Sequence, residues 1–313
     1  HQSARVGPPR YPRPVTTRPH RLLVLSWLCG MLLTGCAPAD PAPAHTPTPS
    51  PTAMDFTVPD AAVAMVDRLL SEADSQKVLT VDITAETVEV TVLDTDDKPV
   101  AWAYRDGEIG QVATDQQYVD QATFDVSRFN FSDVGALFRA AAGQSGSAEN
   151  QTLTIVDYSG GNVTMSVSTV PESRTVFFTP SGALLPILNF DTEGGITQGI
   201  TDALGSRLTV YSVTVDSGQG VWVDYPGEPD TVVRRTRTSK VPVTTNVTAR
   251  SVSLPLFLAA RVSAASIWKV VDAARSAGEL PEEGGWSVVI DDRRNLGAPR
   301  IDRKSTRLNS SHT

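Results

Sequence analysis

Residues 55–301 alternate helical and strand-like patterns of apolar positions. Pro59 precedes a segment, 60–73, whose apolar residues recur at helical spacing, which predicts an amphipathic helix. Runs rich in strand-favouring residues follow at 79–84, 87–93 and 100–104 and predict three strands. Asp106-Gly107 then predicts a tight hairpin turn.

The same alternation continues to the end of this region. A second helix is predicted at 132–142, followed by strands at 153–156, 163–167 and 175–179. A third helix at 196–204 ends at Gly205, a residue favoured just beyond a helix, and strands are predicted at 208–215 and 221–225. The predicted fold class is α+β, with helices packed on antiparallel sheets.

An internal repeat organises these elements. Residues 123–143 align without a gap on 256–276, so that Phe124 matches Phe257 and the N-cap candidates Asn130 and Ser263 coincide. Three further matches keep the same order. They pair Leu79-Thr80-Val81 with Leu208-Thr209-Val210, Val100–Arg105 with Val232–Arg237, and Ile155-Val156-Asp157 with Val289-Ile290-Asp291.

The repeat predicts two halves, 55–189 and 190–301. We expect about four helices, each packed on a sheet of three to four strands. In this alignment Ile301 corresponds to about residue 167, while the first half continues to about Leu188. The second half is therefore expected to lack its last hairpin, of roughly 20 residues.

Leu33-Thr34-Gly35-Cys36 follows a basic segment and an apolar run at 22–33. This arrangement resembles the lipobox of bacterial lipoproteins, and the apolar run is shorter than the roughly 20 residues of a membrane span. The resemblance implies a signal peptide at 15–35, beginning at Val15, and a palmitate-bearing lipid anchor on Cys36. The protein would then lie on the extracytoplasmic face of the cell membrane.

The flanking segments receive separate interpretations. Residues 1–14 are expected to be upstream read-through, and the Pro, Ala and Thr of 36–54 predict an extended tether. Residues 302–313, DRKSTRLNSSHT, resemble a translated sequencing adapter and are expected to contribute nothing to the fold.

Composition narrows the chemistry of residues 36–301. The whole chain carries a net charge of −8 although its first 35 residues are basic, which argues against nucleic acid as a partner. Within 36–301 the single cysteine is Cys36 and the single histidine is His45. Catalysis by Ser-His-Asp or Cys-His groups and metal sites built on histidine are therefore excluded there, and no cofactor, metal or enzymatic activity is expected.

Two clusters remain as candidate sites. Arg234, Arg235, Arg237 and Lys240 form the basic cluster and could bind a phosphate or carboxylate, although ion pairing on the surface is the alternative. The acidic turn Asp94–Asp97 could bind Ca²⁺ weakly but lacks the pattern of an EF-hand loop. Trp102, Trp222, Trp268 and Trp286 could line a ligand groove or belong to the core.

The hairpins at 105–109 and 179–184, which follow helix and meander units, resemble those of PepSY-type extracytoplasmic modules. The resemblance implies a non-catalytic module that binds a partner. The leading hypothesis is accordingly a membrane-tethered binding or interaction lipoprotein, with an envelope protein as partner. A carrier of a lipid or another hydrophobic molecule is the alternative, and an enzyme that uses only carboxylates is the third.

Overall fold

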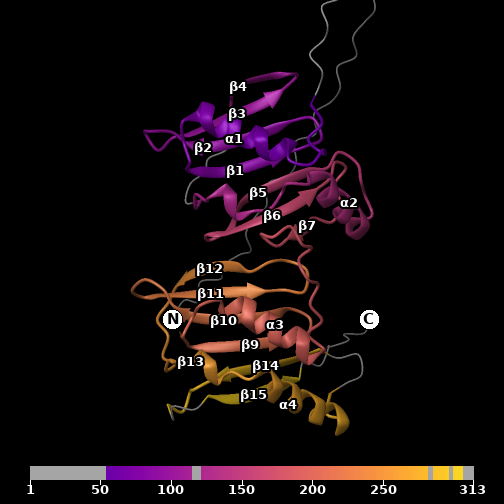
Figure 1. Ribbon diagram of the computed structural model, residues 1–313. Coiled ribbons are helices and arrows are strands. Elements are labelled where there is room, and N and C mark those ends of the chain that lie inside the picture. The colour runs from indigo at the N-terminus through magenta and orange to yellow at the C-terminus, as the bar shows by residue number, and fades with distance from the viewer. Residues whose placement is uncertain (1–53, 115–120, 281–284, 296–298, 306–313) are drawn as a thin grey trace, which may run out of the picture. The chain divides into compact units, whose positions relative to one another are not determined.

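The computed structural model describes residues 54–114, 121–280, 285–295 and 299–305 (Figure 1). Residues 1–53, which include Cys36, the predicted signal peptide and nearly all of the predicted tether, lie outside this part. Across the described residues the chain forms four α-helices and two large antiparallel sheets. The predicted α+β class is therefore confirmed.

The first sheet has seven strands in the order β4-β3-β2-β1-β5-β6-β7. Its strands are β1 (Val78–Ile83), β2 (Val88–Leu93), β3 (Pro99–Arg105), β4 (Glu108–Val112), β5 (Thr152–Ser159), β6 (Asn162–Ser168) and β7 (Val176–Phe178). Helices α1 (Ala61–Ala73) and α2 (Val134–Ser145) belong to the same half, as does the short 3₁₀ helix η1 (Val126–Arg128).

Burial of one helix stripe and one sheet face builds the first core. Helix α1 buries Met65, Val66 and Leu69, which recur at helical spacing. The paired residues Val81 of β1 and Ile155 of β5 are fully buried and belong to the same cluster. This core is contributed by residues from Phe56 to Phe178.

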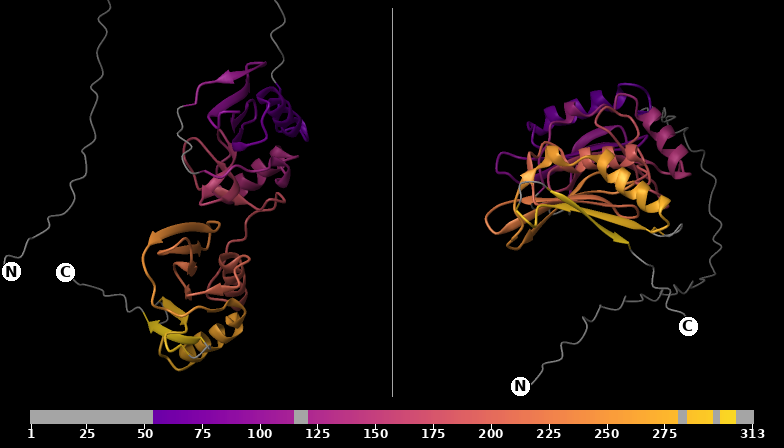
Figure 2. Two further views of the ribbon diagram at one scale, coloured as in Figure 1. Left: turned by 90° about the vertical axis from the view of Figure 1, so that its left-hand side faces the viewer. Right: turned by 90° about the horizontal axis from the view of Figure 1, so that it is seen from below.

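The second sheet has six strands in the order β12-β11-β10-β9-β14-β15. They are β9 (Ser212–Asp216), β10 (Gly220–Pro226), β11 (Thr231–Arg237), β12 (Thr244–Ala249), β14 (Trp286–Asp291) and β15 (Arg300–Ser305). A separate pair is formed by β8 (Thr209–Val210) and β13 (Phe257–Leu258), and the 3₁₀ helix η2 (Ala259–Arg261) follows. Helices α3 (Glu193–Leu204) and α4 (Ala264–Ser276) pack on this half. The right-hand view of Figure 2 shows the orange helix α4 over one face of the orange and yellow strands.

The two sheets share one topology. Each contains a four-stranded meander, β4 to β1 or β12 to β9, whose innermost strand pairs with the first strand of the next hairpin. The pairs that make this junction are β1 with β5 and β9 with β14. The predicted sheets of three to four strands therefore exist as meanders, but pairing between them makes one continuous sheet in each half.

The register of the repeat differs from the sequence alignment. Val78 bridges to Phe124, and Val210 pairs with Phe257, so Val78 corresponds to Val210 rather than Leu79 to Leu208. Ile155 pairs with Val81, and Ile290 pairs with Val213. Ile155 therefore corresponds to Ile290 rather than to Val289, a shift of one residue. A shift of one residue exchanges the two faces of a strand, so burial decides the register.

Three local predictions are corrected. Helix α2 begins after Asp133, whose carboxylate accepts a hydrogen bond from Ala136 N at 2.7 Å, whereas Asn130 bonds Ser132 and Ser181 instead. The predicted strand 208–215 is divided at Tyr211, because its first part pairs with β13 and its second part with β10 and β14. Residues 302–305, expected outside the fold, continue β15 beside β14. Backbone pairing of this kind needs no particular side chains.

Candidate functional site

The structure does not bring the four residues of the basic cluster together. Side chains alternate between the two faces of a strand, so Arg234 lies on one face of β11 and Arg235 and Arg237 lie on the other. Lys240 is exposed beyond the end of the strand. A single anion site built from all four side chains is therefore excluded by their placement.

Arg237 is a buried structural residue with 1% of its surface exposed. Its Nε donates to the Asp202 carboxylate at 3.0 Å, and its two terminal nitrogens donate to the carbonyls of Thr238, Val241 and Pro186. Arg235 donates to the Asp202 carbonyl at 3.2 Å. Both side chains therefore bind α3, and Arg237 also binds the neighbouring loops.

Arg234 lies in a second ion network on the opposite face. It donates two hydrogen bonds to Asp224, of 2.7 and 2.8 Å, and these hydrogen bonds raise the pKa of the Arg234 guanidinium. Arg250 donates to the same carboxylate at 3.2 Å, and the Arg234 guanidinium lies 5.7 Å from the centre of the Trp222 ring. A shallow pocket of about 470 Å³ is lined by Trp222 and Arg234 together with Gly218, Gln219, Thr236 and Thr238. Of the four predicted basic residues, Arg234 alone lines this pocket.

The acidic turn is occupied by its own contacts. The Asp94 carboxylate accepts hydrogen bonds from the backbone nitrogens of Asp96 and Lys98, and Lys77 pairs with Asp97 at 2.6 Å. Among the described residues, no group of three or more His, Cys, Asp or Glu side chains could hold a metal ion. Trp286 is buried and donates its indole N–H to Asp191, so it serves the core.

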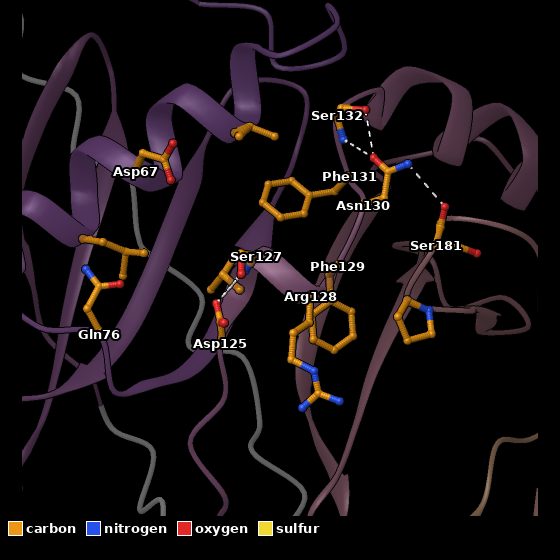
Figure 3. Close-up of a pocket in the computed structure, with 14 residues that line it drawn as sticks. Asp67, Gln76, Asp125, Ser127, Arg128, Phe129, Asn130, Phe131, Ser132 and Ser181 are labelled. Carbon is orange, nitrogen blue, oxygen red and sulfur yellow. Dashed lines mark hydrogen bonds between the residues drawn. The ribbon is translucent and has the colours of Figure 1, made fainter.

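One groove in the first half lies beside α1, and we call it groove 1. It has a volume of about 740 Å³ and is formed by α1, the turn after it, η1 and the segment leading to α2. Its lining comprises Val63, Asp67, Leu70, Gln76, Asp125–Ser132, Pro180 and Ser181. Figure 3 shows Asp67 and Gln76 on one wall and Asn130 and Ser181 on the other, with the Phe131 ring between them.

Internal hydrogen bonds fix the shape of groove 1. The Asp125 carboxylate accepts from the hydroxyl and the backbone nitrogen of Ser127, and these bonds hold the pKa of that carboxyl below its ordinary value. The Asn130 amide donates to Ser181 O while its oxygen accepts from Ser132. The wall is thus a fixed array of polar groups around buried phenylalanines.

Two polar side chains of groove 1 lack partners within the described residues. Among the described residues, the Asp67 carboxylate and the Gln76 side-chain amide make no hydrogen bond or ion pair with another protein group, and both side chains are exposed. Polar groups on a concave surface without internal partners are available to a ligand. Groove 1 is therefore the first candidate binding site.

A corresponding groove in the second half, groove 2, has a volume of about 470 Å³. It is formed by α3, β8, η2 and the start of α4, which are the counterparts of the elements around groove 1. The bridge of Val78 to Phe124 and the pairing of Val210 with Phe257 show which residues of the two halves correspond. The buried residues of α1 also recur at the same spacing in α3. Corresponding lining residues are Val63 and Thr197, Asp67 and Thr201, Leu70 and Leu204, Gln76 and Leu208, Val126 and Ala259, and Ser127 and Ala260.

The two grooves have different chemistry. Where groove 1 has the polar Gln76, Asp125 and Ser127, groove 2 has Leu208, Leu258 and Ala260. Sequence reasoning predicted neither groove, because each is assembled from segments about 50 residues apart. The correspondence at 123–143 and 256–276 contains part of both and was the one available indication.

Two further observations bear on classification. Within the described part of the chain, none of the helices is both long enough and apolar enough to cross a bilayer. In comparisons with models of known protein families and with curated proteins, the chain matches none.

Proposed function

We propose that this protein is a non-catalytic binding lipoprotein, anchored through Cys36 at the extracytoplasmic face of the cell membrane, and that groove 1 binds its partner. The proposal is supported by the unused Asp67 and Gln76 side chains on a preformed groove of about 740 Å³. The lipobox pattern and the predicted tether support the membrane location.

The partner proposed for groove 1 is a segment of an envelope protein. Two carboxylates, Asp67 and Asp125, stand on its walls beside one cation, Arg128, so the groove favours a cationic side chain. The buried rings of Phe129 and Phe131 form its floor and add apolar contact. A peptide segment with basic and apolar side chains satisfies both requirements.

Crosslinking in the producing cells tests groove 1. A photoreactive amino acid at Gln76, an exposed side chain without an internal partner, is expected to capture one envelope protein reproducibly. The matched control places the same amino acid at Val247, which is 61% exposed on β12 in the other half. Equal labelling from both positions, or none from Gln76, would contradict a specific partner in groove 1.

The lipid anchor has an independent test. Metabolic labelling with an alkyne-bearing palmitate analogue is expected to mark the wild-type protein, and Cys36→Ser is expected to abolish the label. A protein that stays labelled without Cys36 would refute the assignment of this residue as the anchor.

The alternative, a carrier of a hydrophobic molecule, has one supporting feature, the apolar lining of groove 2. A carrier requires an enclosed apolar space, whereas the helix–sheet interfaces described here are occupied by buried side chains such as Leu69, Ile196 and Ile267. Native mass spectrometry of protein purified from its host separates the hypotheses, because a carrier retains a bound lipid.

A further inference from the structure

Three leucines beside groove 2 are exposed to solvent, and we call Leu208, Leu256 and Leu258 the leucine patch. Their exposed fractions are 80%, 46% and 51%. Leu256 immediately precedes β13 and Leu258 ends it, whereas Phe257 between them is buried. Leu208 and Leu258 both line groove 2, so the patch is continuous with it.

The fold does not require leucine at these positions. Their counterparts in the first half are Gln76, Thr123 and Asp125, which are polar. The same backbone arrangement therefore forms with polar side chains, and the leucines serve something other than the packing of their own half. Exposed apolar patches of this kind mark contact with a partner or a membrane.

The charges around the patch indicate which surface it contacts. Arg207 directly precedes Leu208 and Arg261 follows Leu258 by three residues, both arginines are exposed, and residues 203–210 and 249–262 contain no Asp or Glu. This absence is unusual in a chain whose net charge is −8. Leucines bordered by arginines are complementary to an apolar layer beneath negative headgroups.

Other occupants fit less well. In a symmetric dimer the same patch would face its copy, which would bring Arg207 and Arg261 of one chain near those of the other. A small hydrophobic ligand would sit inside groove 2, yet Leu208 is mostly exposed and Leu256 lies outside the groove lining. Side chains that project into solvent suit insertion into an interface.

We propose that the leucine patch, with Arg207 and Arg261, contacts the surface of a membrane that contains anionic lipids. The leucines enter the boundary between headgroups and acyl chains, and the two guanidinium groups bind headgroup phosphates. This contact goes beyond the binding proposed for groove 1. It rests on the proposed lipid anchor only in that the anchor keeps the domain close to a membrane.

Vesicle sedimentation tests the patch without the anchor. The protein is the chain from residue 36 onward with Cys36→Ser, which contains every member of both core clusters, from Phe56 to Ile301. The probes are vesicles of phosphatidylcholine alone and of phosphatidylcholine mixed equally with phosphatidylglycerol. We expect sedimentation with the mixed vesicles and weaker sedimentation with phosphatidylcholine alone.

Substitutions with first-half residues provide the matched variants. The triple variant Leu208→Gln, Leu256→Thr and Leu258→Asp is expected to lower partitioning onto mixed vesicles at least tenfold, because three apolar side chains no longer enter the interface. Leu208→Gln alone changes the most exposed leucine and keeps the test valid if the triple variant folds poorly. Val247→Thr, an exposed apolar residue elsewhere, should partition like the wild type.

Charge and apolar contributions are separable. Arg207→Gln with Arg261→Gln should reduce binding to mixed vesicles severalfold and leave binding to phosphatidylcholine unchanged. Wild-type protein that does not bind mixed vesicles, or leucine variants that bind as tightly as Val247→Thr, would overturn the proposal. A dimer that the leucine variants abolish without any vesicle binding would also overturn it. None of these results depends on palmitate labelling or on crosslinking at groove 1.

Discussion

Replacement of the buried Arg237 with methionine is expected to destabilise the second half strongly. Methionine has a similar length but donates no hydrogen bond, so Arg237→Met removes the Arg237 hydrogen bonds to the Asp202 carboxylate and to the carbonyls of Thr238, Val241 and Pro186. A buried acceptor without a partner costs about 1–3 kcal/mol.

The expected loss of stability depends on which of the acceptors freed by Arg237→Met water can reach. Asp202 is 25% exposed and can be hydrated, so the loss of its ion pair contributes little of the cost. The three carbonyls surround a side chain that is 1% exposed, and part of their penalty is relieved if water enters. We expect the free energy of unfolding to fall by about 3–5 kcal/mol, as for other broken buried pairs.

Urea unfolding monitored by tryptophan fluorescence measures the change. The second half contains Trp222, Trp268 and Trp286, three of the five tryptophans of the chain, so fluorescence reports mainly on that half. Arg234→Met is the matched control, because Arg234 lies on the other face of the same strand with 44% of its side chain exposed. It should cost less than Arg237→Met, because Arg250 still donates to the Asp224 carboxylate at 3.2 Å.

The comparison of these two variants is decisive for the role of Arg237. If Arg237→Met lowers stability by less than about 1 kcal/mol, or by no more than Arg234→Met, the side chain does not hold the structure together and the reasoning from burial fails.

Three further substitutions test other parts of the fold. Gly220→Ala should lower the free energy of unfolding in urea by at least about 2 kcal/mol, because φ of Gly220 is +109° and a Cβ atom would lie 2.3 Å from Arg237 O. In the control Gly110→Ala the added Cβ meets no atom within 4 Å, so this variant should be nearly neutral. Asp133→Ala removes the N-cap bond of α2 and should cost about 1 kcal/mol by the same measurement. Burial raises the pKa of Asp82 above 3.8, so the folded state binds more protons than the unfolded state and stability falls as pH rises above about 4 towards the raised pKa. Asp82→Asn should flatten this dependence, which thermal unfolding at pH 4 and pH 7 would detect; an unchanged pH profile would refute the role of Asp82.

Local patterns in the sequence predict the helices and meanders because their determinants are local. The apolar stripe that ends at Ala73 and the turn at Asp106-Gly107 are set by residues within one element or one turn. The joining of the meanders was not predicted, because β1 and β5 are separated by about 70 residues. Pairing over that distance depends on which faces are buried together, which no local pattern contains.

The basic cluster shows the same limit within a single strand. Arg234 and Arg237 are three residues apart, an odd spacing that places them on opposite faces of β11. The sequence indicates that the positive charges are close along the chain. The faces on which they lie, and the carbonyls that surround Arg237, depend on α3 and on loops distant in sequence.

The register of the repeat determines which first-half residues the exposed leucines are compared with. Aligned on Leu79, which is 1% exposed, Leu208 would be expected in the core. The bridges to Phe124 and Phe257 shift the correspondence by three residues, so that the counterpart of Leu208 is the polar Gln76. An exposed leucine at a position where the same fold accepts glutamine requires an explanation outside the core. Contact with a membrane surface supplies that explanation, and the Leu208→Gln variant tests it with the residue that the first half already carries there.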